Sequence, residues 1–118
     1  MAAVTRPRPE ATRTLAEVRA AVDSLDRELV ALLAERMRFM EAAARIKAAR
    51  HEVRDDARKR EVIANARAEA IAHGLDPDLV GRLWDVLVEA SIAHELAAFD
   101  RRAGHDSVAK GGVGAWRE

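Results

Sequence analysis

The sequence predicts an all-α protein, and three observations support this prediction. The 118 residues are 49% hydrophobic but only 3% aromatic, a composition typical of helix formers rather than strands. Neither proline nor glycine occurs between Pro9 and Gly74, so no residue in that stretch interrupts a helix. Apolar residues then recur alternately three and four positions apart, which is the spacing of one helix face. The length is that of one domain with a modest core.

The first predicted helix is long enough to need a partner. A capping box formed by Thr14 and Glu17 marks its start, and we expect the helix to run to about Ala49. It would be roughly 54 Å long, whereas a compact domain of this size is only about 35 Å across. Its apolar seam would therefore extend past its own core, which predicts a homodimer in which the long helices pair. The seam comprises Leu15, Val18, Val22, Leu25, Leu29, Leu32, Arg36, Phe39, Ala43 and Ile46.

Two further helices follow. Residues 50–55 are highly charged and lose the seam, which predicts a short loop. Asp55 or Asp56 is the expected N-cap of the second helix, which ends before His73-Gly74. The Asp76-Pro77 pair supplies an N-cap and a proline at the first helical position of the third helix, expected to run to about Arg102.

These elements predict one helical domain over residues 11–102, with a tail at either end. Residues 1–10 include an Arg-Pro-Arg-Pro stretch that cannot begin a helix cleanly, and residues 103–118 hold four of the six glycines. We expect both tails to be flexible.

Composition excludes several classes of function. The 20 lysines and arginines balance the 20 acidic residues, so the positive field that binds nucleic acid or anionic lipid is absent. The chain has no cysteine, no apolar run long enough for a membrane span and no signal-peptide core, which predicts a cytoplasmic protein. The four histidines show no paired ligand spacing, so no metal site is expected.

Arg36 occupies a seam position where an apolar residue is expected. Burying a guanidinium without a partner costs several kcal/mol, so Arg36 requires a counter-charge. A salt bridge within the dimer would supply it, and so would a bound anion. Lys47 lies eleven residues on, about 20° around the helix and roughly 16 Å along it. The two cations could therefore hold opposite ends of a small dianion.

The third helix places two polar residues on its buried face. With Arg82 set at 0°, Asp85 and Glu89 fall at about 300° and 340° and define the solvent face. Ser91 falls near 180° and Glu95 near 220°, so both need buried hydrogen-bonding partners. Ser91 could bond its own helix and Glu95 a cation of the first helix, or both could line a polar pocket. No nucleophilic triad or phosphate-binding loop occurs, so any catalysis is electrostatic and conformational.

Several short segments together resemble the all-helical (type II) chorismate mutases, over about residues 15–100. They are Leu25-Asp26, Leu32-Leu33-Ala34-Glu35-Arg36, Ile46-Lys47, Val53-Arg54-Asp55 with Arg58, and Ser91-Ile92-Ala93-His94-Glu95. The resemblance implies an intertwined three-helix homodimer with two equivalent pockets and no cofactor. It also implies a small-molecule substrate, and the Claisen rearrangement of chorismate to prephenate in aromatic amino-acid biosynthesis.

The resemblance also implies a role for each candidate site residue. Arginines hold the two carboxylates of the substrate, and Lys47 and Glu95 hydrogen-bond its ether oxygen as the catalytic pair. The implied substrate-binding residues are Arg36 and Arg58 of one chain, Arg19 of the partner chain, Asp55 beside the ring hydroxyl, Ser91 near a carboxylate, and Lys59.

Two positions depart from the common pattern of these mutases. Many members have Gln where this chain has Glu95, although some, notably fungal ones, have Glu, and a carboxyl group donates only when protonated. Many have Glu against the ring hydroxyl where this chain has Lys59. The related isochorismate pyruvate-lyases of salicylate and siderophore synthesis also lack that Glu. A lyase, a mutase acting on an amino analogue of chorismate, and a non-enzymatic coiled-coil dimer therefore stay as alternatives.

Overall fold

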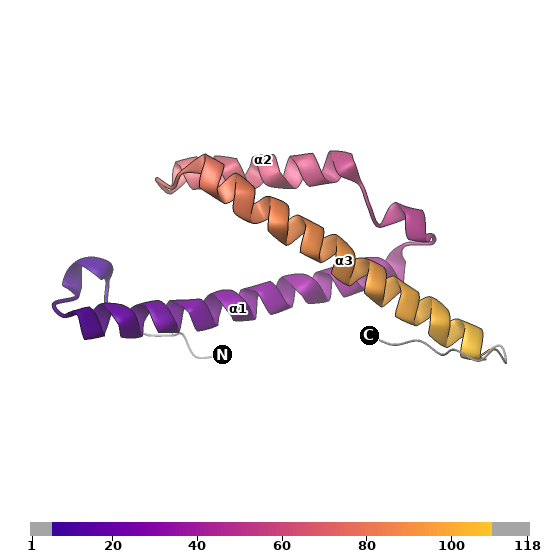
Figure 1. The fold of residues 1–118 in the computed structure, drawn as a ribbon, viewed down its shortest axis with the longest axis horizontal. Coiled ribbons are helices and arrows are strands. Elements are labelled where there is room, and N and C mark those ends of the chain that lie inside the picture. Colours follow the sequence, from indigo (N-terminus) through magenta and orange to yellow (C-terminus); the bar gives the residue numbers. More distant parts are fainter. Residues whose placement is uncertain (1–5, 110–118) are drawn as a thin grey trace. The chain divides into compact units, whose positions relative to one another are not determined.

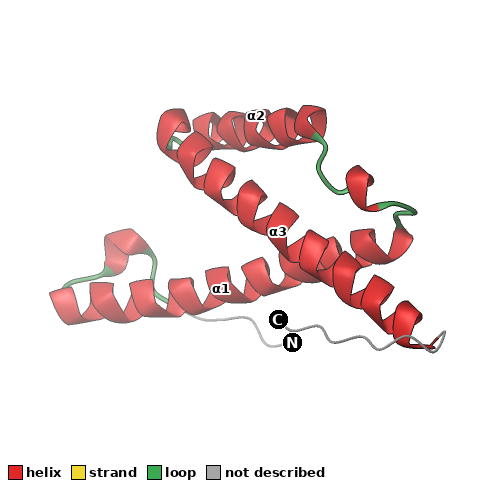
Figure 2. Cartoon of the chain, turned by 45° about the vertical axis from the view of Figure 1, so that its right-hand side comes forward, coloured by secondary structure: helices red, strands yellow, loops and turns green. Residues whose placement is uncertain are grey.

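The computed structural model describes residues 6–109, with side chains through residue 104. Those residues form three α-helices and two short 3-10 turns and contain no strand, which confirms the all-α prediction (Figures 1 and 2). The elements are η1 (Pro9–Ala11), α1 (Leu15–Ile46), η2 (Arg50–Glu52), α2 (Asp56–Ala72) and α3 (Pro77–Ala109). The chain groups into two units that divide between Arg36 and Met37, within α1. The single domain predicted over residues 11–102 stays a prediction.

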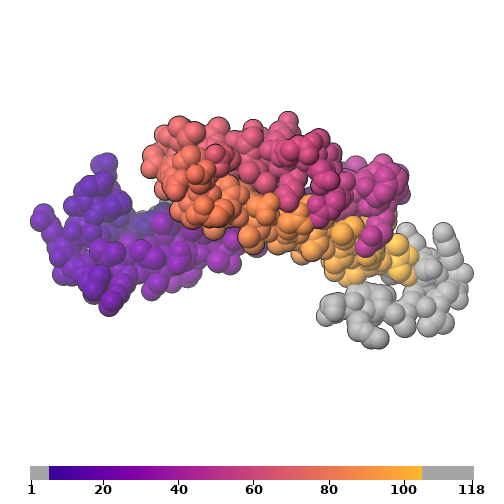
Figure 3. Space-filling view, turned by 45° about the horizontal axis from the view of Figure 1, so that its top comes forward, coloured from indigo at the N-terminus to yellow at the C-terminus, as the bar shows by residue number. Residues whose placement is uncertain are grey.

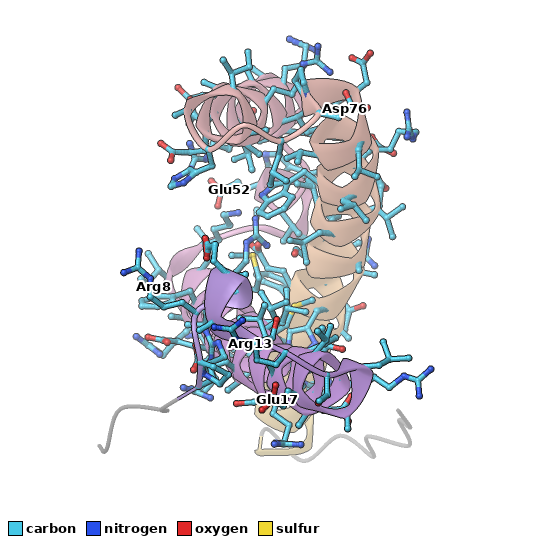
Figure 4. All side chains as sticks on the ribbon, turned by 90° about the vertical axis from the view of Figure 1, so that its left-hand side faces the viewer. Arg8, Arg13, Glu17, Glu52 and Asp76 are labelled. Carbon is cyan, nitrogen blue, oxygen red and sulfur yellow. The ribbon has the colours of Figure 1, made fainter. Side chains whose placement is uncertain are left out.

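Helix α1 begins at the predicted capping box. The Thr14 hydroxyl accepts a hydrogen bond from the Glu17 amide at 3.1 Å, and the Glu17 carboxylate accepts from the Thr14 amide at 3.0 Å. The Arg13 amide donates to the same carboxylate at 2.6 Å. Arg13 and Glu17 are labelled in Figure 4. Reciprocal capping of this kind satisfies backbone donors that the first turn of a helix leaves free.

The end of α1 differs from the prediction, because the helix stops at Ile46 rather than near Ala49. Ala49 is extended, with φ −137° and ψ 148°. The Glu52 carboxylate accepts hydrogen bonds from the amides of Ala48 and Ala49 at 2.8 and 3.1 Å, so those donors are lost to α1. The bond from Ala49, followed by that from Ala48, lowers the pKa of Glu52. The predicted loop thus contains a capped 3-10 turn.

Helices α2 and α3 form a hairpin with the predicted caps. Asp55 caps α2 by accepting from the Arg58 amide at 3.0 Å. Gly74 ends α2 with φ +74°, and the Leu75 amide returns to the Ala70 carbonyl at 2.8 Å, as in a Schellman motif. The Asp76 carboxylate accepts from the second residue of α3 at 2.9 Å.

Helix α3 continues past its predicted end near Arg102 and reaches Ala109. With 33 residues it is about as long as α1, which has 32, so the predicted end of the third helix is wrong. Residues 103–109 of the predicted tail are helical, and residues 110–118 lie outside the described part. Gly104 is compatible with the helix because one glycine costs only about 1 kcal/mol there.

The core of the second unit lies between α2 and α3, which pack against each other (Figure 3). One cluster centres on Val53, Val88 and Ile92, and a second contains three small residues, Ala66, Ala70 and Val80. Trp84 packs against both clusters and joins them. This core places the buried face of α3, which carries Ser91 and Glu95, toward the rest of the unit.

The first unit carries the N-terminal part of the apolar seam, and that seam is solvent-exposed in the single chain. Leu29 is 50% exposed and Leu32 58%. Part of the predicted tail is ordered here, because Arg6 pairs with Glu28 at 3.0 Å; residues 1–5 lie outside the described part. The other seam residues that are exposed are Leu15, Val18, Val22, Leu25, Phe39 and Ile46. The homodimer stays a prediction.

Candidate active site

The two predicted catalytic residues contact each other. Lys47 is the first residue after α1, and its amide donates to the Ala43 carbonyl at 2.9 Å. Its ammonium donates to Oε2 of Glu95 on α3 at 2.6 Å. The Glu95 side chain is only 6% exposed and that of Lys47 28%. The structure therefore brings a lysine and a carboxyl group from distant parts of the chain to one partly buried point.

Ser91 lies one turn before Glu95 on the same buried face of α3. The residue is 3% exposed, and its hydroxyl donates to the Leu87 carbonyl at 2.7 Å. Periodicity predicted this burial correctly for both Ser91 and Glu95. Their contacts match the simpler of the two sequence interpretations, in which the hydroxyl bonds its own helix and the carboxylate pairs with a cation of the first helix.

Asp55 and Arg58 lie at the exposed start of α2. The Asp55 carboxylate caps the helix through the Arg58 amide. The Arg58 guanidinium is 61% exposed and pairs with Glu61, one turn along the same helix, at 2.5 Å. An exposed pair of this kind contributes little to stability, so a bound anion could replace Glu61 at small cost. The substrate contacts of both residues stay predictions.

Lys59 is held by carboxylates of α3. Its ammonium lies 3.0 Å from Asp85 and 2.7 Å from Glu89, and Arg54 also contacts Glu89 at 2.7 Å. The hydrogen bond from Arg54, followed by that from Lys59, lowers the pKa of Glu89 to about 2. The same contacts, first with Glu89 and then with Asp85, raise the pKa of Lys59. Lys59 therefore ties α2 to α3 in this structure.

Arg19 and Arg36 lie on the part of α1 that belongs to the first unit. Arg19 is exposed and Arg36 is half-buried. Their predicted roles concern the pocket of a dimer and stay predictions.

Sequence reasoning missed a group of polar contacts that hold the end of α1 against α3. His94 Nε2 lies 2.7 Å from Glu41, and the Arg50 guanidinium pairs with Asp100 at 2.9 Å. Arg102 donates to the Arg45 carbonyl at 2.7 Å. In the sequence, these residues lie on both sides of Lys47 and on both sides of Glu95. The charged residues of α3 were visible in the sequence, but their partners lie about 50 residues away.

Within residues 6–104, no group of three or more acidic or histidine side chains could hold a metal ion. In that same part of the chain, no helix is long and apolar enough to cross a membrane.

Comparison with known proteins places these features in a family. The family model for chorismate mutase type II matches residues 18–96. The bifunctional chorismate mutase/prephenate dehydratase of Enterobacter agglomerans is 30% identical over 92 residues, which cover 77% of this chain and 24% of that protein. The chain thus spans about a quarter of the length of this relative. Because the family model covers most of α1, all of α2 and α3 as far as Leu96, the chain belongs to the chorismate mutase type II family.

Proposed function

We propose that this protein is a chorismate mutase, which rearranges chorismate to prephenate in aromatic amino-acid biosynthesis. Its family membership supports the proposal, as does the relative named a chorismate mutase/prephenate dehydratase. The observation that carries it is the Lys47–Glu95 contact of 2.6 Å on the buried face of α3. These are the two residues to which the resemblance assigns the ether oxygen of the substrate.

The reaction makes limited demands on the protein. It is unimolecular, breaking one C–O bond while forming one C–C bond, so no nucleophile or external proton source is required. The protein must bind a compact chair-like conformer and stabilise the negative charge that develops on the ether oxygen. The Lys47 ammonium is a donor for that oxygen. Glu95 is a second donor when it is protonated, and this residue is only 4% exposed.

The two carboxylates of the substrate need cations. Arg36 and Arg58 of one chain and Arg19 of its partner supply them in our proposal, with Ser91 near a carboxylate and Asp55 at the ring hydroxyl. The exposed apolar seam of α1 supports the dimer that this arrangement needs, because pairing two seams removes both from water. A cytoplasmic location, expected from the composition, belongs to the same proposal.

Lys59 is already engaged in ion pairs in this structure, which limits its possible contact with the substrate. Asp85 and Glu89 neutralise its charge, so it could contact substrate only by leaving one of these carboxylates. At this position the chain lacks the Glu of many mutases, as the isochorismate pyruvate-lyases do, but neither the family model nor the relative favours the lyase activity.

The test is product analysis with both substrates. The purified protein is incubated with chorismate, and separately with isochorismate, and prephenate, salicylate and pyruvate are quantified by chromatography. We expect prephenate from chorismate. Lys47→Met keeps the aliphatic stem but loses the donor, and should reduce the rate about 100-fold or more. Salicylate and pyruvate from isochorismate without prephenate from chorismate, or full activity of Lys47→Met, would overturn the proposal.

A further inference from the structure

Arg102 caps the C-terminal end of α1 by hydrogen bonds to backbone carbonyl groups. Its Nη1 donates to the Arg45 carbonyl at 2.7 Å and reaches the Ala44 carbonyl at 3.4 Å. Both carbonyls belong to the last turn of α1, where carbonyl groups have no partner within the helix. A cation at this end also interacts favourably with the helix dipole. Arg102 therefore stabilises the turn that directly precedes Lys47.

The backbone hydrogen bonds of α1 end at Lys47. Its amide forms the last helical bond of α1, to Ala43 at 2.9 Å. The next amides, of Ala48 and Ala49, donate instead to the Glu52 carboxylate. Fraying of the last turn would therefore move the point from which the lysine side chain reaches Glu95.

We propose that Arg102 is a positioning residue for the Lys47 ammonium, acting through the last turn of α1. This inference rests on the proposed function, in which Lys47 contacts the ether oxygen. Arg102 and Lys47 line the same groove of about 410 Å³, with Arg45 and Phe99. The family match ends at residue 96, so Arg102 lies outside the matched residues, on the last part of α3.

The length of α3 suits this role. The helix continues to Ala109, so Arg102 lies seven residues inside it rather than at a fraying terminus. The nearby Arg50–Asp100 pair is more than half exposed at Arg50, and such pairs contribute little. Among the α3 side chains described, those through residue 104, Arg102 is thus the one that bonds directly to the backbone at the end of α1.

The experiment compares three variants of the full chain by steady-state kinetics with chorismate and by hydrogen exchange. Arg102→Met keeps the stem and loses the donors, whereas Arg102→Lys keeps a cation and a donor. Arg101→Met is the matched control, since Arg101 is an adjacent arginine that makes no hydrogen bond to the end of α1. The exchange readout is the amide of Lys47, referenced to the buried Ala66 in α2.

For Arg102→Met we expect kcat to fall about fivefold to tenfold with KM changed less than twofold, because Lys47 acts mainly in the transition state. The Lys47 amide should exchange about tenfold faster while Ala66 is unchanged. Arg102→Lys should recover at least half of the lost kcat, and Arg101→Met should match the wild type. Loss of kcat with unchanged exchange at Lys47, or faster exchange with unchanged kcat, would overturn the proposal.

Two further outcomes would distinguish a positioning role of Arg102 from direct substrate binding and from a failure of the proposed function. A rise in KM with kcat unchanged would mean that Arg102 binds substrate directly, and the positioning role would be wrong. A wild-type protein that consumes no chorismate would overturn the proposed function and with it the catalytic role of the contact. Exchange at the Lys47 amide would then still decide whether Arg102 caps α1.

Discussion

Replacing Glu95 with Gln tests the catalytic pair most directly. In the structure the Glu95 carboxylate accepts a 2.6 Å hydrogen bond from Lys47 and is almost inaccessible to water. A carboxylate at that point cannot donate to the ether oxygen of the substrate and repels the charge developing there. A Gln side chain has nearly the same shape, can accept from Lys47 through its carbonyl, and donates through its amide at every pH.

The expected effect on stability is small and the effect on rate is large. The Gln carbonyl would still accept from the charged Lys47 ammonium, and a hydrogen bond to a charged group contributes about 1.5–3 kcal/mol, so we expect loss of the second charge to weaken the contact by only about 1 kcal/mol. Glu95→Gln also removes the free-energy cost of burying a charged carboxylate, and this gain offsets part of the loss. A correctly placed donor at a developing oxyanion is worth about 100-fold or more in kcat. Because Lys47 already supplies one donor, we expect Glu95→Gln to raise kcat about tenfold or more near pH 8.

The assay is the initial rate of chorismate consumption at saturating substrate, measured from about pH 5 to 8.5. At pH 8 the Glu95→Gln variant should be faster than the wild type, because its amide donates to the ether oxygen and a carboxylate does not. Glu69→Gln makes the same chemical change at an exposed position on α2 and should leave the profile of the wild type intact. A Glu95→Gln variant that is slower than the wild type at every pH would refute the assignment of Glu95 as a donor.

Three other predictions concern assembly and stability. Leu29→Asp should give unfolded or aggregated protein rather than a stable monomer, because the charge would be buried in the dimer seam; sedimentation showing a folded, active monomer would contradict the dimer. Arg19→Ala and Arg36→Ala should each be nearly inactive, but co-refolding the two should restore one intact pocket per heterodimer; no recovery would mean that the pocket is not shared. Glu89 contributes stability that is present above its ordinary pKa and lost as the pH falls toward about 2, since its folded-state pKa is lowered chiefly by Arg54. The denaturant midpoint of Glu89→Gln should therefore lie below that of the wild type at about pH 6 and approach it at about pH 2, and an equal difference at both pH values would argue against this contribution.

Much of the fold was predictable because its signals are local. The capping box at Thr14, the Asp55 cap and the glycine that ends α2 each act through hydrogen bonds within about five residues. The 100° spacing of a helix likewise depends only on the chain itself, and it correctly placed Ser91 and Glu95 on the buried face of α3. For these features the neighbouring sequence contains both partners of every interaction that decides the outcome.

The remaining features depend on contacts between segments far apart in the chain. Lys47 and Glu95 are 48 residues apart, and Lys59 finds Glu89 across 30 residues, so periodicity could indicate that each needed a partner but not which partner it has. The end of α1 was misplaced because Glu52 draws two amides away from the helix, and the length of α3 was underestimated from a glycine that its helix accommodates. Sequence alone therefore determined the order of the helices, several of their caps and the buried face of α3, because backbone capping and side-chain periodicity are local. Only the tertiary structure decided which charges meet, because ion pairs form wherever helix packing brings opposite charges together, whatever their separation in the chain.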